Sequence, residues 1–303
     1  MKRRRFLTIT AGFAAIAAMP LQAATVRRWK GVALGAGASI ALAHPEADRL
    51  IGAALAEIAR LERVFSLYRA DSELSQLNAT GVLDAPSFDM VVCLGLCDQV
   101  NGATEGLFDP SVQPLWATYA EAQAQGTTPT SADIAAARAR TGWHGVGIDS
   151  ARIQLRPGMA LTLNGVAQGF IADRVADLLR GQGVDDVLID TGEIVAIGHQ
   201  PDGAVWPVSI RDGADIALTD RALATSAPLG TVLDQAGRVG HIIDARSGKA
   251  GVSVWRQVTV SAGSAAIADA LSTAACLMPD LATIERACSA MGDARPEHVL
   301  REV

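Results

Sequence analysis

Apolar and polar positions alternate with two different periods along this chain, and these periods predict its elements. Residues 31–43 have the short apolar runs of strands, with Gly35 and Gly37 between them. Pro45 is expected to open a helix, because apolar residues then recur at helical spacing. The residues of this apolar face are Ile51, Leu55, Ile58, Leu61 and Phe65. Residues 66–81 are mostly polar and predict a loop.

Strands and helices continue to exchange along the rest of the chain. Helices are predicted over residues 88–101, in an Ala-rich segment capped by Ser131, and from the glycine-rich residues 164–169 through Leu179. Hairpins are predicted over residues 152–163 and near residues 235–237, with buried strands from 187 to about 211. Two final helices carry Asp269 and Arg286. The order lacks the regular alternation of a doubly wound sheet, so we expect an α+β (mixed α/β) fold.

The first 23 residues have the pattern of an export signal. A basic start is followed by a short apolar run and by small residues up to Ala23. Arg3 and Arg4, followed by Phe6 and Leu7, also fit the twin-arginine pattern. The apolar run is shorter than the roughly 20 residues of a membrane-spanning helix. We therefore expect cleavage after Ala23 and a periplasmic protein, not a lipoprotein, whose single domain covers residues 24–303.

The charge of the chain excludes some classes of partner. Removing the four cations of the signal from the formal net charge of −6 leaves −10 for residues 24–303. Such an acidic protein is not expected to bind nucleic acid or an anionic membrane. Four cysteines lie in apolar, helix-like runs, where buried thiols are favoured over disulfides: Cys93, Cys97, Cys276 and Cys288.

One pair of residues has the spacing of a metal site. Asp269 and Thr273 are four residues apart in a small, apolar run, so a helix would place both on one face. Two oxygen ligands of this kind suit Mg²⁺. The alternative is that Asp269 caps a helix and Thr273 is merely buried. Spacing alone leaves both interpretations open.

Six stretches in order extend the interpretation beyond spacing. They are residues 68–78 (YRADSELSQLN), 106–110 (GLFDP), 163–173 (LNGVAQGFIAD), 224–226 (ATS), 241–248 (HIIDARSG) and 268–273 (ADALST). Together they resemble the ApbE family, the FAD:protein FMN transferases. The resemblance implies a single catalytic domain with mixed sheets flanked by helices. It also implies an Mg²⁺-dependent enzyme that splits FAD and attaches FMN to a Thr or Ser of an acceptor redox protein, releasing AMP.

Two other functions stay open for the same site. Water in place of the acceptor hydroxyl would make the protein an FAD pyrophosphatase that yields free FMN and AMP. A non-catalytic periplasmic FAD carrier is the third hypothesis, although an Asp269/Thr273 pair is not needed for storage. The resemblance is also compatible with peripheral contact between this protein and membrane redox complexes that carry the acceptor.

The resemblance assigns roles to individual residues. Asp269, Thr273 and the backbone carbonyl of Gly165 would be the Mg²⁺ ligands. His241 would take the proton from the acceptor hydroxyl, a role that suits an imidazole. Asp244 could orient the surroundings of His241 or cap the turn that follows Asp244, and we favour the turn cap. The residues implied to contact FAD are Leu34, Tyr68, Leu107, Phe108, Asp109, Thr162, Gln168 and Ile243.

Overall fold

The fold is built on a seven-stranded sheet. The structure is a computed structural model that describes residues 26–33, 35–213, 215–250 and 253–302. The strand order of the sheet is β1-β2-β6-β7-β10-β13-β14, and each neighbouring pair is antiparallel. Its strands are β1 (Arg27–Ala33), β2 (Ala36–Leu42), β6 (Val187–Asp190), β7 (Ile194–Ile197), β10 (Arg221–Ser226), β13 (Trp255–Ala262) and β14 (Arg295–Arg301).

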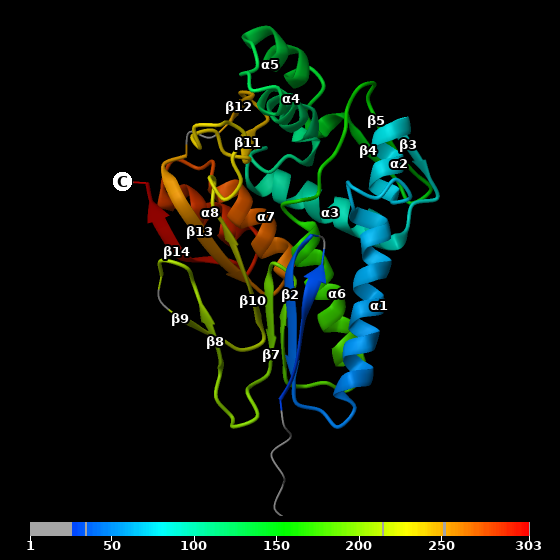
Figure 1. Ribbon diagram of the computed structural model, residues 1–303, viewed down its shortest axis with the longest axis vertical. Helices are drawn as coiled ribbons and strands as arrows, with labels where there is room; N and C mark the ends of the chain where they lie inside the picture. Colours follow the sequence, from blue (N-terminus) through cyan, green and yellow to red (C-terminus); the bar gives the residue numbers. More distant parts are fainter. Residues whose placement is uncertain (1–25, 34, 214, 251–252, 303) are drawn as a thin grey trace, which may run out of the picture.

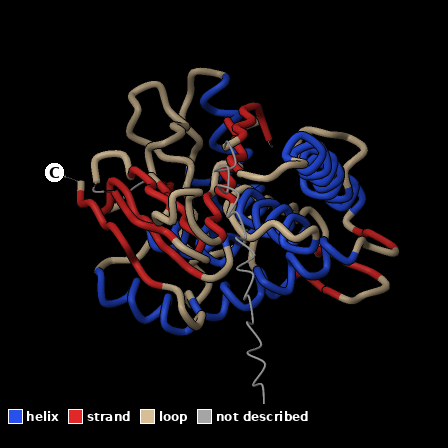
Figure 2. The backbone as a smooth tube through the Cα atoms, turned by 90° about the horizontal axis from the view of Figure 1, so that it is seen from below, coloured by secondary structure: helices blue, strands red, loops and turns tan. Residues whose placement is uncertain are grey.

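Helices pack against the sheet and against one another, as Figures 1 and 2 show. Helices α6 and α7 contact its strands, α1 packs on α6, and α3 packs on α7. Most buried apolar side chains lie in one core that the sheet shares with these helices. The helices are α1 (Ala47–Phe65), α2 (Glu73–Thr80), α3 (Phe88–Ala103), α4 (Gln113–Ala124), α5 (Ser131–Arg138), α6 (Ala167–Gly181), α7 (Ala265–Ala275) and α8 (Leu281–Ala290).

Smaller elements surround this centre. A three-stranded sheet has the order β3-β5-β4, and two hairpins pair β8 with β9 and β11 with β12. Two short 3₁₀ turns complete the described chain. The bounds are β3 (Val82–Asp84), η1 (Pro110–Val112), η2 (Trp143–Gly145), β4 (Val146–Ile148), β5 (Arg152–Leu155), β8 (Trp206–Ser209), β9 (Asp215–Leu218), β11 (Ile243–Asp244) and β12 (Lys249–Ala250).

The α+β class predicted from the sequence is confirmed, with one correction of detail. Every described strand pair is antiparallel, so the sheets are not mixed in strand direction. For two of these pairs, β1 with β2 and β6 with β7, the connection is only a few residues long, and such a link can reverse a strand but cannot carry the chain back to start a parallel neighbour. The link of residues 191–193 between β6 and β7 is of this kind.

The prediction of a loop over residues 66–81 is wrong in its second half. Helix α2 begins after Ser72, whose Oγ accepts the N–H of Ser75. Leu74 and Leu77 are fully buried, and Gly81 ends the helix in the left-handed region at φ 76°. Two buried leucines one turn apart therefore stabilise a helix in a segment whose other residues are polar.

The hairpin predicted over residues 152–163 is also wrong. β5 instead pairs with β3 and β4, which flank it in the small sheet. The segment after Pro157 pairs with no strand in the described part of the chain. The side chain of Asn78 replaces one, since its Nδ2 donates to the Leu161 carbonyl at 2.8 Å and its Oδ1 accepts the Leu161 N–H at 2.7 Å. A side-chain amide thus satisfies backbone groups that a ladder would otherwise pair.

The remaining element boundaries need smaller corrections. Thr130, not Ser131, caps α5, because the Thr130 side chain accepts from Asp133 in a capping box. The turn predicted near residues 235–237 exists, but the chain on its two sides forms an isolated bridge between Val232 and Gly240 rather than two strands. Asp234 also closes the turn, since its Oδ1 accepts the N–H groups of Arg238 and Val239. All four cysteines are free and buried, as the sequence favours.

Two features concern the cellular setting. In the described part of the chain, no helix combines the length and apolar character that crossing a bilayer requires. The predicted export signal lies outside the described residues, as does Leu34.

Candidate active site

Helix α7 brings the two predicted metal ligands into the centre of the molecule. Ser264 caps the helix, since its Oγ accepts the N–H of Ile267. Asp173 of α6 accepts the N–H groups of Ala265 and Ala266 at 2.7 and 3.0 Å. With Ser264 as the cap, the alternative interpretation of Asp269 as the cap of α7 is wrong. Asp269 lies instead in the helix interior, and the helix start is fastened to α6.

Asp269 is a buried carboxylate whose charge lacks compensation. The residue is only 3% exposed, and its Oδ2 accepts the N–H of Gly169 at 3.4 Å. No Lys, Arg or His among the described residues forms an ion pair with it. Burial raises the pKa of Asp269 to about 7. A buried carboxylate of this kind is stable only when a proton or a cation is bound at its oxygens.

The hydroxyl of Thr273 and the main chain of Gly165 approach each other closely beside this carboxylate. A Cβ atom added at Gly165 would lie 2.9 Å from Thr273 Oγ1, so only glycine leaves this space open. Gly169 is required for a related reason, because a Cβ there would overlap the Ala265 carbonyl at the start of α7. The two glycines let the segment before α6 and the first turn of α6 itself lie directly against α7.

The donor set fits Mg²⁺ in its chemistry. It consists of one carboxylate, one hydroxyl and one backbone segment, which are the hard oxygen donors that Mg²⁺ takes. Among the described residues, no group of three His, Cys, Asp or Glu side chains forms a site for a softer metal. The buried, uncompensated carboxylate supplies the charge that would hold a cation.

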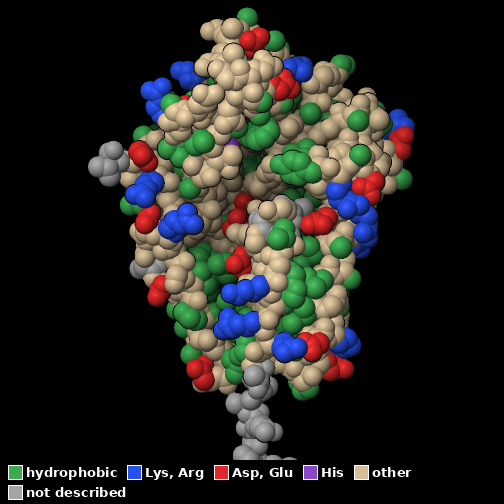
Figure 3. Space-filling model, in the orientation of Figure 1, with side chains coloured by type: hydrophobic (Ala, Val, Ile, Leu, Met, Phe, Trp, Pro, Cys, Tyr) green, Lys and Arg blue, Asp and Glu red, His purple; other side chains and the backbone are tan. Residues whose placement is uncertain are grey.

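These groups line a cavity of about 370 Å³. Figure 3 shows this face of the molecule hollowed at mid-height, with acidic side chains at the base of the hollow. The structure thereby brings together predicted site residues from four separate parts of the chain. Those that line the cavity are Leu107, Phe108, Asp109, Thr162, Gly165, Gln168, His241, Ile243, Asp269 and Thr273.

A second cavity of about 530 Å³ adjoins the first. Four residues line both cavities: Asn164, Gln168, Thr231 and His241. Tyr68 lines the second cavity and is 84% exposed, so an aromatic ring stands at its rim with its faces open. Tyr68 is the described member of the predicted site that lies outside the first cavity.

His241 is held between the two cavities in a defined tautomer. Its Nδ1 lies 3.1 Å from the Thr231 carbonyl and 3.2 Å from the Pro228 carbonyl. Carbonyl oxygens only accept, so Nδ1 carries the proton and Nε2 has the lone pair in the neutral ring. Burial lowers the pKa of His241 below its ordinary value of 6.5. The imidazole is therefore neutral and able to accept a proton at pH 7.

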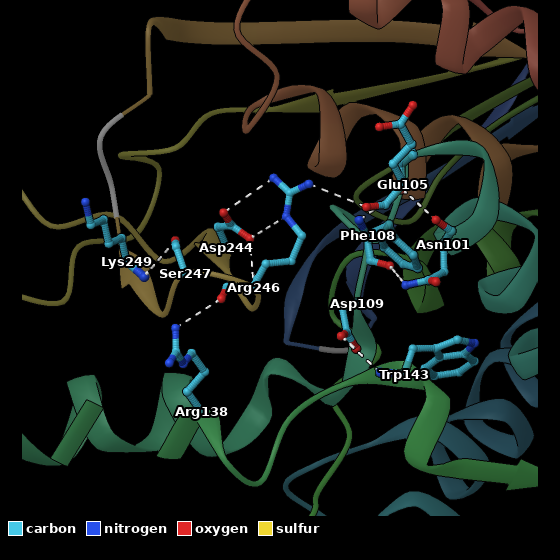
Figure 4. A network of polar contacts seen from close by, with 11 residues as sticks. Asn101, Glu105, Phe108, Asp109, Arg138, Trp143, Asp244, Arg246, Ser247 and Lys249 are labelled. Atoms are coloured by element: carbon cyan, nitrogen blue, oxygen red, sulfur yellow. Dashed lines mark hydrogen bonds and ion pairs between the residues drawn. The ribbon is translucent and has the colours of Figure 1, made fainter. Parts of the chain in front are cut away.

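The loop between α3 and α4 forms one wall of the first cavity, and Figure 4 shows how it is fixed. Asn101 Nδ2 donates to the Phe108 carbonyl at 2.8 Å. Asp109 accepts the N–H groups of Ser111 and Trp143 at 2.8 and 3.2 Å. Asp109 thus caps the turn at η1 and at the same time lines the cavity.

The opposite wall comes from the segment after His241. Asp244 Oδ1 accepts the Arg246 N–H at 2.9 Å, which confirms the expected turn cap. The Arg246 side chain donates to the Glu105 carbonyl at 3.4 Å and so connects the two walls (Figure 4). Ile243 in β11 is buried and lines the cavity between them.

Sequence reasoning missed several residues of the cavity. Glu193 is only 8% exposed, and burial together with the charge of Asp269 raises its pKa well above the ordinary value. The sequence feature that could have indicated Glu193 is an acidic residue directly after a glycine turn at the end of a buried strand. Asn164 lies inside the glycine-rich motif, and Ser226 closes the Ala-Thr-Ser motif, yet neither was singled out.

Fold and site together define an α+β protein in which a buried helix presents a carboxylate and a hydroxyl to a large cavity. The model of the ApbE family matches residues 34–293, and the chain belongs to this family. A FAD:protein FMN transferase from Vibrio cholerae is 32% identical over 229 residues, which cover 70% of this chain and 68% of that protein. One from Klebsiella pneumoniae is 30% identical over 254 residues, covering 77% and 72%.

A solved structure supports the same relationship. The crystal structure of Pseudomonas stutzeri flavinyl transferase ApbE, in its apo form, superimposes with a TM-score of 0.79 at 30% identity. The superposition covers 88% of this chain and 92% of that one.

Proposed function

We propose that this member of the ApbE family is a FAD:protein FMN transferase, the activity for which its relatives are named. It would split the diphosphate of FAD and join FMN to a Thr or Ser hydroxyl of an acceptor protein. The observation that carries the proposal is the meeting of Asp269, Thr273 and the Gly165 main chain in a cavity that His241 also lines.

Asp269, Thr273 and the Gly165 backbone would hold Mg²⁺ in this proposal. When bound, the cation neutralises charge on the diphosphate and stabilises the leaving phosphate. Phosphoryl transfer needs mainly positioning and charge neutralisation. A buried carboxylate with no ion-pair partner among the described residues suits the requirement for positioning, because it would fix the position of the cation.

In this proposal the dinucleotide would occupy both of the adjoining cavities. The first contains the metal-site residues and would accept the diphosphate and the AMP half against Phe108 and Asp109. The second would accept the flavin against Tyr68, whose ring is open for stacking. Gln168 lines both cavities and would contact FAD where they join.

His241 would act on the acceptor hydroxyl. Its Nε2 takes the hydroxyl proton as the oxygen forms a bond to the phosphorus of the FMN half. The bond from this phosphorus to the bridging oxygen breaks, and AMP leaves with that oxygen. The hydrogen bond from Nδ1 to the Thr231 carbonyl holds the ring in the tautomer that this step requires.

We also propose that the protein acts in the periplasm after export. The support is the sequence of residues 1–23, with its basic start, apolar run and small residues. The acceptor would then be a periplasmic or membrane-bound redox protein with an accessible Thr or Ser.

Incubation of the purified protein with FAD and Mg²⁺, with and without a candidate acceptor, tests the proposal. We expect AMP to be released in step with acceptor labelling. Abundant free FMN in the absence of acceptor would favour the pyrophosphatase instead. If the protein binds FAD but releases AMP under none of these conditions, the result would favour a carrier and contradict the transferase.

A further inference from the structure

A chain of three hydroxyl groups connects the proposed metal ligand Thr273 to the backbone of α7. Ser226, the last residue of β10, has its Oγ 2.7 Å from Ser272 Oγ and 3.3 Å from Thr273 Oγ1. Ser272 Oγ in turn lies 3.0 Å from the backbone carbonyl of Asp269. Ser272 is fully buried, whereas Ser226 and Thr273 both line the first cavity.

The carbonyl of Asp269, at the end of this series of hydroxyl groups, fixes the direction of each hydrogen bond in the series. The Asp269 carbonyl has no proton, so Ser272 donates its single hydroxyl proton there. Ser226 must then be the donor to Ser272. With that proton used, the contact between Ser226 and Thr273 is a hydrogen bond only if Thr273 donates.

This direction determines what Thr273 can offer to a cation. A neutral hydroxyl binds a metal ion through an oxygen lone pair and keeps its proton, which needs an acceptor. Ser226 Oγ is that acceptor, and the Thr273 lone pairs are then left to face the cavity. If the Thr273 proton pointed into the cavity instead, it would oppose a cation held beside Asp269.

We infer that Ser226 is a positioning residue of the metal site, which sets the hydroxyl of Thr273 for Mg²⁺ binding. The inference rests on the proposed function, because it assumes that Thr273 is a ligand. Outer groups that orient metal ligands commonly contribute 10–100-fold to metal affinity. Ser226 belongs to the sheet and Thr273 to the helix, so the contact also fixes α7 relative to β10 at the site.

Calorimetric titration of Mg²⁺ into the full mature chain, at a fixed saturating FAD concentration, tests this inference. Ser226→Ala is expected to weaken Mg²⁺ binding by about tenfold or more, in line with other outer-shell changes. Ser226→Thr keeps the oxygen and is expected to restore most of the affinity. Thermal unfolding in EDTA, without FAD, measures whether either change harms the fold itself.

Ser253→Ala is the matched control. Ser253 Oγ donates to the Cys276 carbonyl at the end of the same helix and accepts the Trp255 N–H, so its removal deletes two hydrogen bonds, neither of which involves the three hydroxyl groups. We expect its Mg²⁺ affinity to equal that of the wild type. Equal affinity of Ser226→Ala and the wild type, or an equal loss in both alanine variants, would overturn the role of Ser226.

Asp269→Asn separates this inference from the proposed function. If the wild type binds Mg²⁺ and Asp269→Asn does not, the metal site stands and the Ser226 comparison decides the inference. If the wild type and Asp269→Asn bind Mg²⁺ equally, the metal site itself is refuted, and the role of Ser226 falls with it.

Discussion

The carboxylate of Asp269 accepts the backbone N–H of Gly169 at 3.4 Å, across a separation of 100 residues along the chain. This contact joins helices α6 and α7 at the point where the proposed metal ligands meet. It depends on the lack of a side chain at position 169, because a Cβ there would overlap the Ala265 carbonyl. The geometry of the site therefore depends on the close packing of the two helices.

Gly169→Ala is predicted to damage both stability and activity. The new methyl group would meet backbone that cannot rotate away, so α6 and α7 must separate, at a cost of about 3 kcal/mol, the upper end for overpacking. Gly181→Ala is the control on the same helix, since a Cβ there meets nothing within 4 Å. Chemical denaturation measures both, and equal stability of the two variants would refute the tight contact.

Asp269→Asn is predicted to abolish Mg²⁺-dependent turnover without unfolding the protein. The amide has nearly the same shape but no charge, and burial already raises the pKa of the Asp269 carboxyl to about 7 in the metal-free protein. The metal-free variant should therefore be at least as stable as the wild type at pH 8, where the native carboxyl is charged and buried. Thermal unfolding in EDTA checks the stability, and AMP release checks the turnover.

The affinity for Mg²⁺ is predicted to depend on pH through the same carboxyl. Because the folded pKa of Asp269 is raised to about 7, its proton stabilises the metal-free fold at low pH, and this contribution is lost as the pH rises through 7. Mg²⁺ must displace that proton, so its affinity should fall by about tenfold per pH unit below 7. A titration series from pH 5.5 to 8 measures this, and a flat profile would argue against Asp269 as a ligand.

His241→Ala is predicted to retain FAD binding and to lose FMN transfer by about 10²–10⁴-fold, the usual contribution of a general base. In the wild type, burial lowers the pKa of His241, so the neutral base persists below pH 6.5. The acid limb of kcat for transfer should therefore lie below that pH. Flavin fluorescence measures binding, and turnover of the variant near the wild-type rate would remove His241 from the chemistry.

The sequence was sufficient to predict the class of fold, and most of the site residues that it proposes lie together at one cavity. Spacing alone places Asp269 and Thr273 on one helix face, and helix α7 has them there. Periodicity also located α1, α3, α6 and β6 within a few residues. These are long or strongly patterned elements, in which local apolar spacing and tertiary packing agree.

The errors occurred where long-range contacts decided the local structure. Helix α2 has a short apolar pattern, and it forms because Leu74 and Leu77 reach the core. The extended segment near Leu161 looks like half of a hairpin, but its partner is the side chain of Asn78, 83 residues away. Glu193 and Ser226 were missed for a similar reason, since only the folded chain places them beside Asp269 and Thr273.

Mass spectrometry of a candidate acceptor protein, co-expressed with this enzyme, tests the central claim most directly. We predict that the acceptor gains the mass of one FMN less one water, as a phosphoester on a Thr or Ser, and that the gain disappears when the enzyme carries Asp269→Asn. An acceptor labelled to the same extent by the wild type and by Asp269→Asn would contradict a transfer that depends on the metal site.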